Sequence, residues 1–213
     1  MNYLLSAFIG FLFGSIPTAY LIIKKAKGID IRDVGSNNVG AMNSYRVSKS
    51  KSLGLMVMLI DLGKGLLSVQ VTIYILGDNF IYPAIASIFA VLAHCFNPWI
   101  GFKGGRGLAT SAGIAISLIP YFLIVWGILW VMFFILKKNI LFSNIGSTIF
   151  SLILFFNTAE IAFEYVTPTP ENLSTLVLLV TSVITIILIK HIEPLRELLL
   201  EKEIFRIKRD GKK

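Results

Sequence analysis

The sequence predicts an all-α integral membrane protein with seven transmembrane helices, one of them short, formed as a single domain over residues 1–213. Three observations support this prediction. Of the 213 residues, 55% are hydrophobic and only 15% are charged, the mean hydropathy is +0.78, and long apolar runs fill most of the chain. This composition is too apolar for an ordinary soluble domain, and the runs are long enough for helices that cross a bilayer.

The apolar runs divide the chain into seven candidate spans, since a helix needs about 17–25 apolar residues to cross a bilayer. The fourth run has only about 12 residues and would cover about 18 Å, so we expect it to cross part of the bilayer or to be shielded by its neighbours. Pro120 separates it from the fifth run, and a five-span arrangement that merges or demotes these pieces is the alternative. The predicted spans are 3–23, 53–76, 80–97, 108–119, 121–136, 141–158 and 173–190.

The distribution of charge predicts the orientation of these spans. If the N-terminus lies outside, all 20 Lys and Arg residues fall on inner segments or at inner span ends, and the outer segments carry only acids. Because cytoplasmic segments of membrane proteins are enriched in Lys and Arg, we expect the N-terminus outside, and the C-terminus and polar loops in the cytoplasm. Topology and anionic headgroups then explain the net charge of +8, and we expect no nucleic-acid partner.

The first polar loop has the composition of a site for a small, hydroxylated anion. It reads GSNNVGAMNSYR at residues 35–46. Glycines permit tight turns, Ser and Asn offer hydroxyl and amide groups, and a guanidinium suits phosphate or carboxylate. Turns use the same residue types, so turn chemistry is the favoured explanation of this loop taken alone. The candidate binding residues are Ser36, Asn38, Asn43 and Arg46.

The second polar loop indicates phosphate binding more directly. It reads FKGGRGLATSAG at residues 102–113 and places two cations among three glycines, just before an apolar run. A helix N-terminus presents unpaired N–H groups and partial positive charge, so an anion binds well there. The spacing is not that of a Walker A loop. The alternative is that the cations anchor lipid headgroups. The predicted phosphate-binding residues are Lys103, Gly104, Gly105, Arg106 and Gly107.

The second and third predicted spans contain one Asp, one Lys, one His and one Cys. Asp61 and Lys64 are three residues apart, share a helix face and are predicted to form a structural ion pair. His94 is expected to be a packed, hydrogen-bonded histidine. Cys95 is not expected to be a nucleophile, because adjacent helical side chains point apart. Two histidines without a nearby array of acids predict no metal site.

Two further residues lie at span mouths. His191, at the end of the last span, could donate to an anion or act as a base. Ser143, near the start of the sixth span, could face the same mouth or cap its helix. We expect Arg46, Ser143 and His191 to close the phosphate site that the second polar loop begins.

Five segments occur in the order and spacing of one known family. With GSIP at 14–17, DLGKG at 61–65, FKGGRGLAT at 102–110, KHIE at 190–193 and the first polar loop, the whole chain resembles the acyl-phosphate-dependent glycerol-3-phosphate acyltransferases of bacteria, the PlsY family. The resemblance implies a seven-span enzyme without a cofactor. It would transfer a fatty acyl group from acyl phosphate to the 1-hydroxyl of sn-glycerol 3-phosphate, giving 1-acylglycerol 3-phosphate (lysophosphatidate) and phosphate.

The resemblance also implies the location and the site. The enzyme would lie in the bacterial inner membrane, among membrane lipids, with a cytoplasmic active site and a functional link to the enzyme that makes acyl phosphate. The site loops would be about 24–52, 94–107, 137–143 and 190–213. His191, Ser143 and Lys103 would be catalytic, with a substrate phosphate oxygen as the alternative base. The residues that match the family motifs are Ser36, Asn38, Arg46, Lys103, Gly104, Gly105, Gly107, Ser143 and His191.

The chain departs from the family pattern at four positions. Asn37 replaces the usual glycine of the first motif and Met42 a usual threonine. Arg106 replaces a usual lysine, which keeps the charge but changes its geometry. Pro194 replaces the asparagine that usually follows the last-motif histidine, and it cannot supply an amide.

Two other functions would explain parts of the pattern. A small transporter or channel for an organic or phosphorylated anion would place polar groups at span mouths. However, it predicts functional polar groups near the bilayer midplane and openings on both sides. A membrane scaffold that binds anionic lipid predicts scattered cations. The two polar motifs on one side of the membrane therefore favour the acyltransferase.

Overall fold

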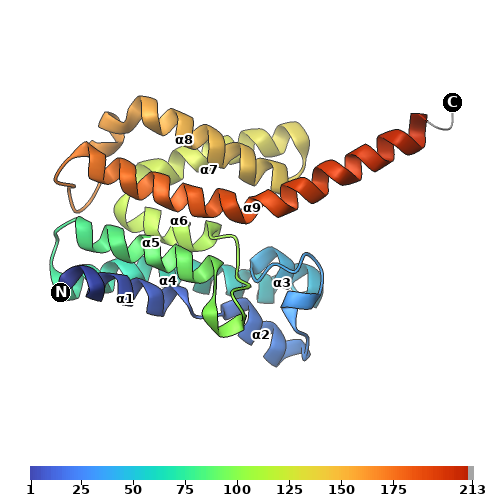
Figure 1. Cartoon of the computed structure of the whole chain (residues 1–213), viewed down its shortest axis with the longest axis horizontal. Helices are drawn as coiled ribbons and strands as arrows, with labels where there is room; N and C mark the ends of the chain where they lie inside the picture. The colour runs from blue at the N-terminus through green and yellow to red at the C-terminus, as the bar shows by residue number, and fades with distance from the viewer. Residues whose placement is uncertain (211–213) are drawn as a thin grey trace.

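The computed structural model describes the backbone of residues 1–210 and the side chains of residues 1–200. Over this part of the chain every regular element is a helix, which confirms the predicted fold class (Figure 1). The elements are α1 (Asn2–Gly14), α2 (Thr18–Lys27), η1 (Ile31–Asp33), α3 (Ala41–Ser48), α4 (Lys51–Leu76), α5 (Ile81–Cys95), η2 (Pro98–Ile100), α6 (Leu108–Leu118), α7 (Pro120–Lys137), α8 (Ile140–Glu164) and α9 (Leu173–Asp210).

The chain is a multi-pass integral membrane protein. Six helical segments in the described residues are long and apolar enough to cross a membrane, and α6 is a further, shorter apolar helix. The first of the six comprises α1 and α2 together. The prediction of seven apolar helices with a short fourth one is therefore confirmed.

The first span is broken, where the sequence predicted one continuous span. Ser15, Ile16 and Pro17 separate α1 from α2. Pro17 has no N–H to donate to a helical bond, and the carbonyls before it turn toward other elements. Lys64 Nζ donates to the Ile16 carbonyl at 3.0 Å, and Asn97 Nδ2 donates to the Ser15 carbonyl at 2.7 Å. The break thus joins the first span to α4 and to the segment after α5.

The last two helices extend beyond their predicted ends at residues 158 and 190. α8 continues to Glu164 with a non-helical residue, Thr158, inside it. The Thr158 hydroxyl donates to the carbonyl one turn earlier at 2.8 Å, a bond that often bends helices. α9 continues to Asp210 and leaves the bundle (Figure 1), so the tail that was predicted to be a helix with a frayed end is helical as far as it is described.

Glycines mark the closest helix contacts. A Cβ at Gly10 or Gly14 of α1 would collide with the backbone of α5, and a Cβ at Gly113 of α6 would collide with the backbone of α4. Small residues let membrane helices approach in this way. α9 contacts both α5 and α8, while α6 contacts α4, α5 and α7. α6 and α9 therefore join the α1–α4–α5 side of the bundle to the α7–α8 side (Figure 1).

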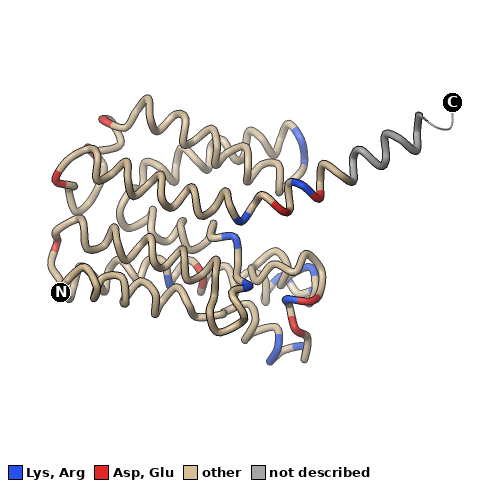
Figure 2. Tube along the Cα trace, in the orientation of Figure 1, with Lys and Arg blue, Asp and Glu red and all other residues tan. Residues whose placement is uncertain are grey.

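The charges are distributed unequally between the two ends of the bundle. Figure 2 shows Lys and Arg gathered, together with several acids, at the end that carries α2, α3 and the loop before α6, whereas the charged residues in the connections at the opposite end, near the N-terminus, are all acids. This arrangement is the one that the predicted orientation requires. Which end faces the cytoplasm remains a prediction.

We expect Gly10→Ala to lower the free energy of unfolding by about 1–3 kcal/mol, because the added methyl group must separate α1 from α5. Gly127→Ala on α7 is the matched control, since a Cβ there has no neighbour within 4 Å. It should be neutral or raise the free energy of unfolding by about 0.5–1 kcal/mol through helix propensity. Unfolding of the two variants in detergent measures the difference, and equal stabilities would contradict the packing argument.

Candidate functional site

Asn43 organises the first polar loop. Its side chain is 1% exposed. Its Nδ2 donates to the carbonyls of Val34 and Asn38, both at 3.0 Å, and its Oδ1 accepts the backbone N–H of Ser36 at 2.9 Å. The amide is therefore occupied with the loop backbone, and a substrate contact by Asn43 remains a prediction. Its hydrogen bonds fix the backbone at Ser36 and Asn38.

The remaining predicted residues of this loop are accessible. Ser36 and Arg46 are exposed, and Asn38 is half-buried. Between Ser36 and Asn38, Asn37 has a positive φ of 54°. Asn tolerates this left-handed conformation better than most residues other than glycine. Asn37 therefore keeps a backbone conformation that suits the glycine usual at this position in the family.

The second polar loop is packed against the end of α5. The Gly105 N–H donates to the His94 carbonyl at 3.1 Å. A Cβ at Gly104 would collide with the His94 carbonyl oxygen, and one at Gly105 would collide with His94 Nε2. Gly107, the residue before α6, has a φ of 85°, which favours glycine. The glycines are thus explained by packing and by the entry into α6, and they leave the exposed Lys103 at the surface.

The two polar loops meet at the starts of two helices. A Cβ at Gly105 would lie 2.9 Å from the carbonyl oxygen of Val39, and Val39 directly precedes Gly40, the N-cap of α3. Gly105 itself is two residues before Gly107, the N-cap of α6. The structure therefore brings the N-terminal ends of α3 and α6 close together. Free N–H groups and the helix dipoles make this region favourable for an anion.

Arg32 links the two chain segments that lead into the polar loops. Its Nη2 lies 2.6 Å from Asp30 Oδ2, and its Nη1 donates to the Ile100 carbonyl at 3.3 Å. The guanidinium also lies over the ring of Tyr20, 5.0 Å from its centroid. The hydrogen bond from Arg32 lowers the pKa of Asp30 to about 2, so the carboxylate stays ionised. Ile100 belongs to η2, just before the second polar loop, and this loop is thus linked to the segment that leads into the first.

Arg106 lies near charges from two helices. It is half-buried, and burial lowers its pKa; the carboxylate of Glu197 on α9 opposes this shift, while the charge of Arg46 on α3 adds to it. Arg106 also acts electrostatically on His191. Two cations in a partly desolvated place favour the binding of an anion. Arg106 therefore lies near enough to Arg46 and to His191 to act on both electrostatically, and a shared site formed by these residues remains a prediction.

His191 has one defined tautomer when neutral. Its side chain is 3% exposed, and Nδ1 lies 2.8 Å from the Ile187 carbonyl. A carbonyl only accepts, so Nδ1 carries the hydrogen and Nε2 of the neutral ring has the free lone pair. Nε2 is buried and makes no hydrogen bond with any residue whose side chain is described. This is the form that can accept a proton or a hydrogen bond.

Ser143 is fully buried near the start of α8, and its hydroxyl donates to the Asn139 carbonyl at 2.8 Å. Asn139, whose Oδ1 accepts the Phe142 N–H, is the cap of this helix, so the alternative of a capping Ser143 is wrong. Among residues 1–200, no hydrogen bond or ion pair joins Ser143 or Lys103 to the other predicted site residues. In the same range, no three His, Cys, Asp or Glu side chains gather in a way that could hold a metal ion.

An apolar groove of about 620 Å³ lies between α6, α7 and α9. Its lining begins at Leu108, next to Gly107, and at Ile187, whose carbonyl holds His191. It continues past Ala115 to Phe122 and contains almost no polar surface. The groove therefore leads from the polar loops into the membrane-spanning part of the protein.

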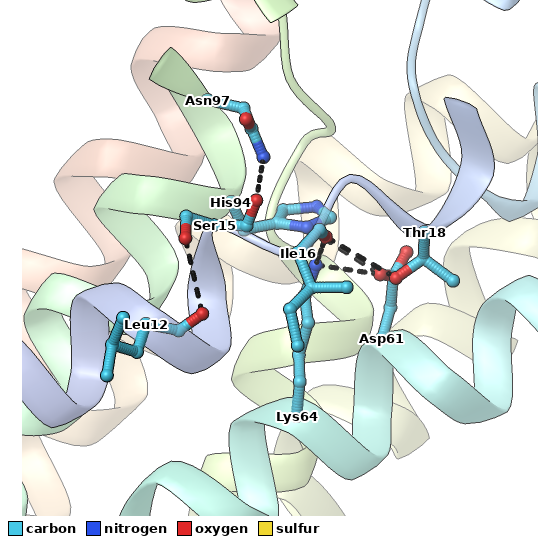
Figure 3. Close-up of polar contacts among 8 residues, drawn as sticks. All are labelled: Leu12, Ser15, Ile16, Thr18, Asp61, Lys64, His94 and Asn97. Atoms are coloured by element: carbon cyan, nitrogen blue, oxygen red, sulfur yellow. Dashed lines mark hydrogen bonds and ion pairs between the residues drawn. The ribbon is translucent and has the colours of Figure 1, made fainter. Parts of the chain in front are cut away.

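The sequence analysis predicted that His94 is packed but missed its contact with the second polar loop, and it missed Asn97 altogether. His94 packs under Gly105 and lies beside the buried pair Asp61–Lys64 (Figure 3). The predicted pairing of Asp61 and Lys64 is confirmed, with Nζ 2.9 Å from Oδ1. Asn97 ties the chain after α5 to the break in the first span. The only signal for Asn97 is its place before a proline, which is common to many turns.

Comparison with known proteins identifies close similarities. The glycerol-3-phosphate acyltransferase family matches residues 4–201. A glycerol-3-phosphate acyltransferase of Leptospira borgpetersenii is 34% identical over 212 residues, which are 99% of this chain and 94% of the relative. One of Helicobacter hepaticus is 40% identical over 130 residues, 56% of this chain and 58% of the relative. A crystal structure of PlsY, an integral membrane glycerol 3-phosphate acyltransferase, in its glycerol 3-phosphate form has a TM-score of 0.77 and 27% identity, covering 94% of both chains.

The positive φ of Asn37 predicts opposite effects of two substitutions. Asn37→Gly should be neutral or slightly stabilising, whereas Asn37→Val should lower the free energy of unfolding by about 1–2 kcal/mol, because a β-branched side chain is strained in the left-handed region. Unfolding in detergent measures both variants. An equal response to glycine and valine would show that this turn does not need the left-handed conformation.

Proposed function

Because the chain belongs to the glycerol-3-phosphate acyltransferase family, as its motifs predicted, we propose that it transfers a fatty acyl group from acyl phosphate to the 1-hydroxyl of sn-glycerol 3-phosphate. The products are lysophosphatidate and phosphate. The observation that carries this proposal is the continuity between a cationic site at two helix starts and an apolar groove. A donor with a phosphate at one end and an acyl chain at the other fits both parts.

The polar loops supply the phosphate contacts. Lys103 and Arg46 are exposed cations on the two loops, and Arg106 is a half-buried cation near Arg46. Charge-assisted hydrogen bonds from such groups, together with N–H groups at the starts of α3 and α6, suit the oxygens of both substrate phosphates. Ser36 and Asn38 lie on the same loop as Arg46 and offer groups for the glycerol hydroxyls.

The groove supplies the site for the acyl chain. α6 has 11 residues, so the wall that it contributes is about 16 Å long. Burial of apolar surface stabilises the bound chain by about 25 cal/mol per Å². Ser111, one turn into α6, lines the groove near the polar loops. Its hydroxyl is buried and has no hydrogen-bond partner among the described residues.

The reaction needs no covalent enzyme intermediate, since phosphate is a good leaving group. The 1-hydroxyl oxygen attacks the acyl carbonyl carbon, a new ester C–O bond forms, and the C–O bond to phosphate breaks with its electron pair on phosphate. The hydroxyl proton passes to Nε2 of His191 or to a phosphate oxygen. Lys103 and Arg106 stabilise the negative charge that develops on the donor, and Ser143, whose hydroxyl hydrogen goes to the Asn139 carbonyl, accepts a hydrogen bond from the acceptor.

The charge distribution supports a bacterial inner-membrane location with the site on the cytoplasmic side. The cations gather at the end of the bundle that carries the polar loops (Figure 2), and cytoplasmic segments are the ones enriched in Lys and Arg. Acyl phosphate is a reactive mixed anhydride, so the enzyme that makes it must supply it close to the enzyme that uses it. We include a functional link to that enzyme in the proposal.

The direct test supplies detergent-purified protein with labelled glycerol 3-phosphate and either palmitoyl phosphate or palmitoyl-CoA. We expect labelled lysophosphatidate from palmitoyl phosphate alone. Product from palmitoyl-CoA alone would overturn the proposed donor, and no product from either donor in folded protein would overturn the proposed reaction.

We expect Lys103→Ala and Arg46→Ala each to lower kcat/KM by about 10²–10³-fold, the usual loss when one group that stabilises developing charge is removed. Lys25→Ala is the matched control, because Lys25 is an exposed lysine on α2 outside the two polar loops. Steady-state rates with palmitoyl phosphate measure the effect, with unfolding as a check on stability. Wild-type rates in both Lys103→Ala and Arg46→Ala would refute the binding of the substrate phosphates at the two polar loops.

Ala115→Trp should shorten the acyl chain that the protein accepts. Ala115 lines the groove, about 10 Å along α6 from Leu108, so the added ring blocks a long chain and spares a short one. We expect kcat/KM to fall at least about 10-fold more for palmitoyl phosphate than for octanoyl phosphate, in keeping with about 1–3 kcal/mol per misfit in an apolar pocket. Ile116→Trp, at an exposed position outside the groove lining, is the control; an equal loss for both donors in Ala115→Trp would exclude this groove as the acyl site.

A further inference from the structure

We propose that the buried side chains of Asp61, Lys64 and His94 form a positioning network that sets the place of the second polar loop. The network lies behind the loop, away from the exposed Lys103, and none of its members is given a contact with substrate. The expected effect of the network on acyl transfer rests on the proposed function, whereas its expected effect on the position of the loop does not.

The three side chains are buried together (Figure 3). Asp61 is 2%, Lys64 3% and His94 6% exposed. Lys64 Nζ lies 2.9 Å from Asp61 Oδ1, and His94 Nδ1 lies 3.8 Å from the same oxygen. A carboxylate removed from water needs a cationic neighbour, so Asp61 fixes Lys64, and the imidazole of His94 packs against the same carboxylate oxygen without a hydrogen bond to it.

The imidazole reaches the loop on its other side. His94 Nε2 and Cε1 occupy the space that a Cβ at Gly105 would need, and the His94 carbonyl accepts the Gly105 N–H at 3.1 Å. Asp61, Lys64, His94, Gly104 and Gly105 line one small pocket of about 170 Å³. The ring is therefore the layer between the ion pair of α4 and the backbone of the loop.

The same network fastens the break in the first span. Lys64 Nζ donates to the Ile16 carbonyl at 3.0 Å (Figure 3), and Asn97 Nδ2 donates to the Ser15 carbonyl at 2.7 Å. α4, the break and the chain before the loop thus converge on one cluster. A shift of any of these elements must move Gly105, and with it the cations on either side.

This arrangement differs from an ion pair that serves stability alone. If the pair served stability alone, two apolar side chains of similar volume could replace it. Such replacements often leave the free energy of unfolding unchanged or raise it. Such a replacement would not hold the His94 ring against Gly105. The expected signature is therefore a loosened loop and weaker binding in a protein that remains folded.

The test makes the side chain at residue 94 smaller and the one at residue 105 larger, first separately and then together. His94→Ala removes the support, Gly105→Ala collides with it, and the double variant places the new methyl group in the vacated space. We measure hydrogen exchange over residues 101–107, and KM and kcat for glycerol 3-phosphate. Each single variant should speed exchange and raise KM by up to about 100-fold, with a smaller loss in kcat. The fold-change in KM of the double variant should be smaller than the product of the fold-changes in the two single variants.

Val69→Ala is the control for a general loss of stability. Val69 is fully buried in α4, about 12 Å along the helix from Asp61, and it packs in the apolar core. It should destabilise the fold and leave both exchange in the loop and KM unchanged. Multiplicative losses in the double variant, or the same loop exchange in Val69→Ala as in His94→Ala, would overturn the network.

A second variant, Asp61→Asn with Lys64→Met, removes both charges together and avoids leaving one of them buried alone. It should unfold near the wild-type temperature and still show faster loop exchange and a raised KM; wild-type values for both would also overturn the proposal. Fast loop exchange in His94→Ala combined with no turnover by the wild-type protein would retain the network and reject the acyl transfer.

Discussion

The contact between the end of α5 and the second polar loop is the constraint on which the rest of the site depends. The loop backbone lies directly on the His94 carbonyl and ring, so only glycine fits at residues 104 and 105. This contact fixes where the chain enters α6, and the entry places the start of α6 beside the start of α3. The cations Lys103 and Arg106 flank the two packed glycines. Their backbone positions are therefore set by the fold before any anion arrives, which is what a preorganised site requires.

The buried charges illustrate the same constraint from the interior. An isolated charge within a membrane protein is costly, yet Asp61 and Lys64 lie 2.9 Å apart in the bundle with His94 beside them. Lys64 also bonds the carbonyl of Ile16 at the break in the first span. One ion pair thus holds a broken helix and, through His94, a loop. Apolar residues could fill this volume, but they could not donate a hydrogen bond to the Ile16 carbonyl.

Much of the fold follows from the sequence because long apolar runs and charge asymmetry are local signals. The short fourth helix and the Asp61–Lys64 pair could be predicted for the same reason: run length and i,i+3 spacing are visible in the chain. Pro17 is a local signal for the break after Gly14, but the partners of the Ser15 and Ile16 carbonyls at residues 97 and 64 could not be predicted. Nor could the choice of Asn43, among the asparagines of its loop, as the buried hub. His94 was predicted to be packed, but its contact with Gly105 is visible only in three dimensions.

The short α6 connects these features to the proposed chemistry. Its 11 residues cover about 16 Å, roughly half of the hydrocarbon core. Such a helix leaves unpaired backbone groups at both ends, which a bilayer does not satisfy. At the far end the Thr167 N–H donates to the Leu118 carbonyl at 3.2 Å. At the near end the free N–H groups lie beside the glycine loop, where a substrate phosphate can satisfy them. A membrane-dissolved donor in the groove and a water-soluble acceptor then meet at that end, because it is the point where the apolar wall stops and the cations begin.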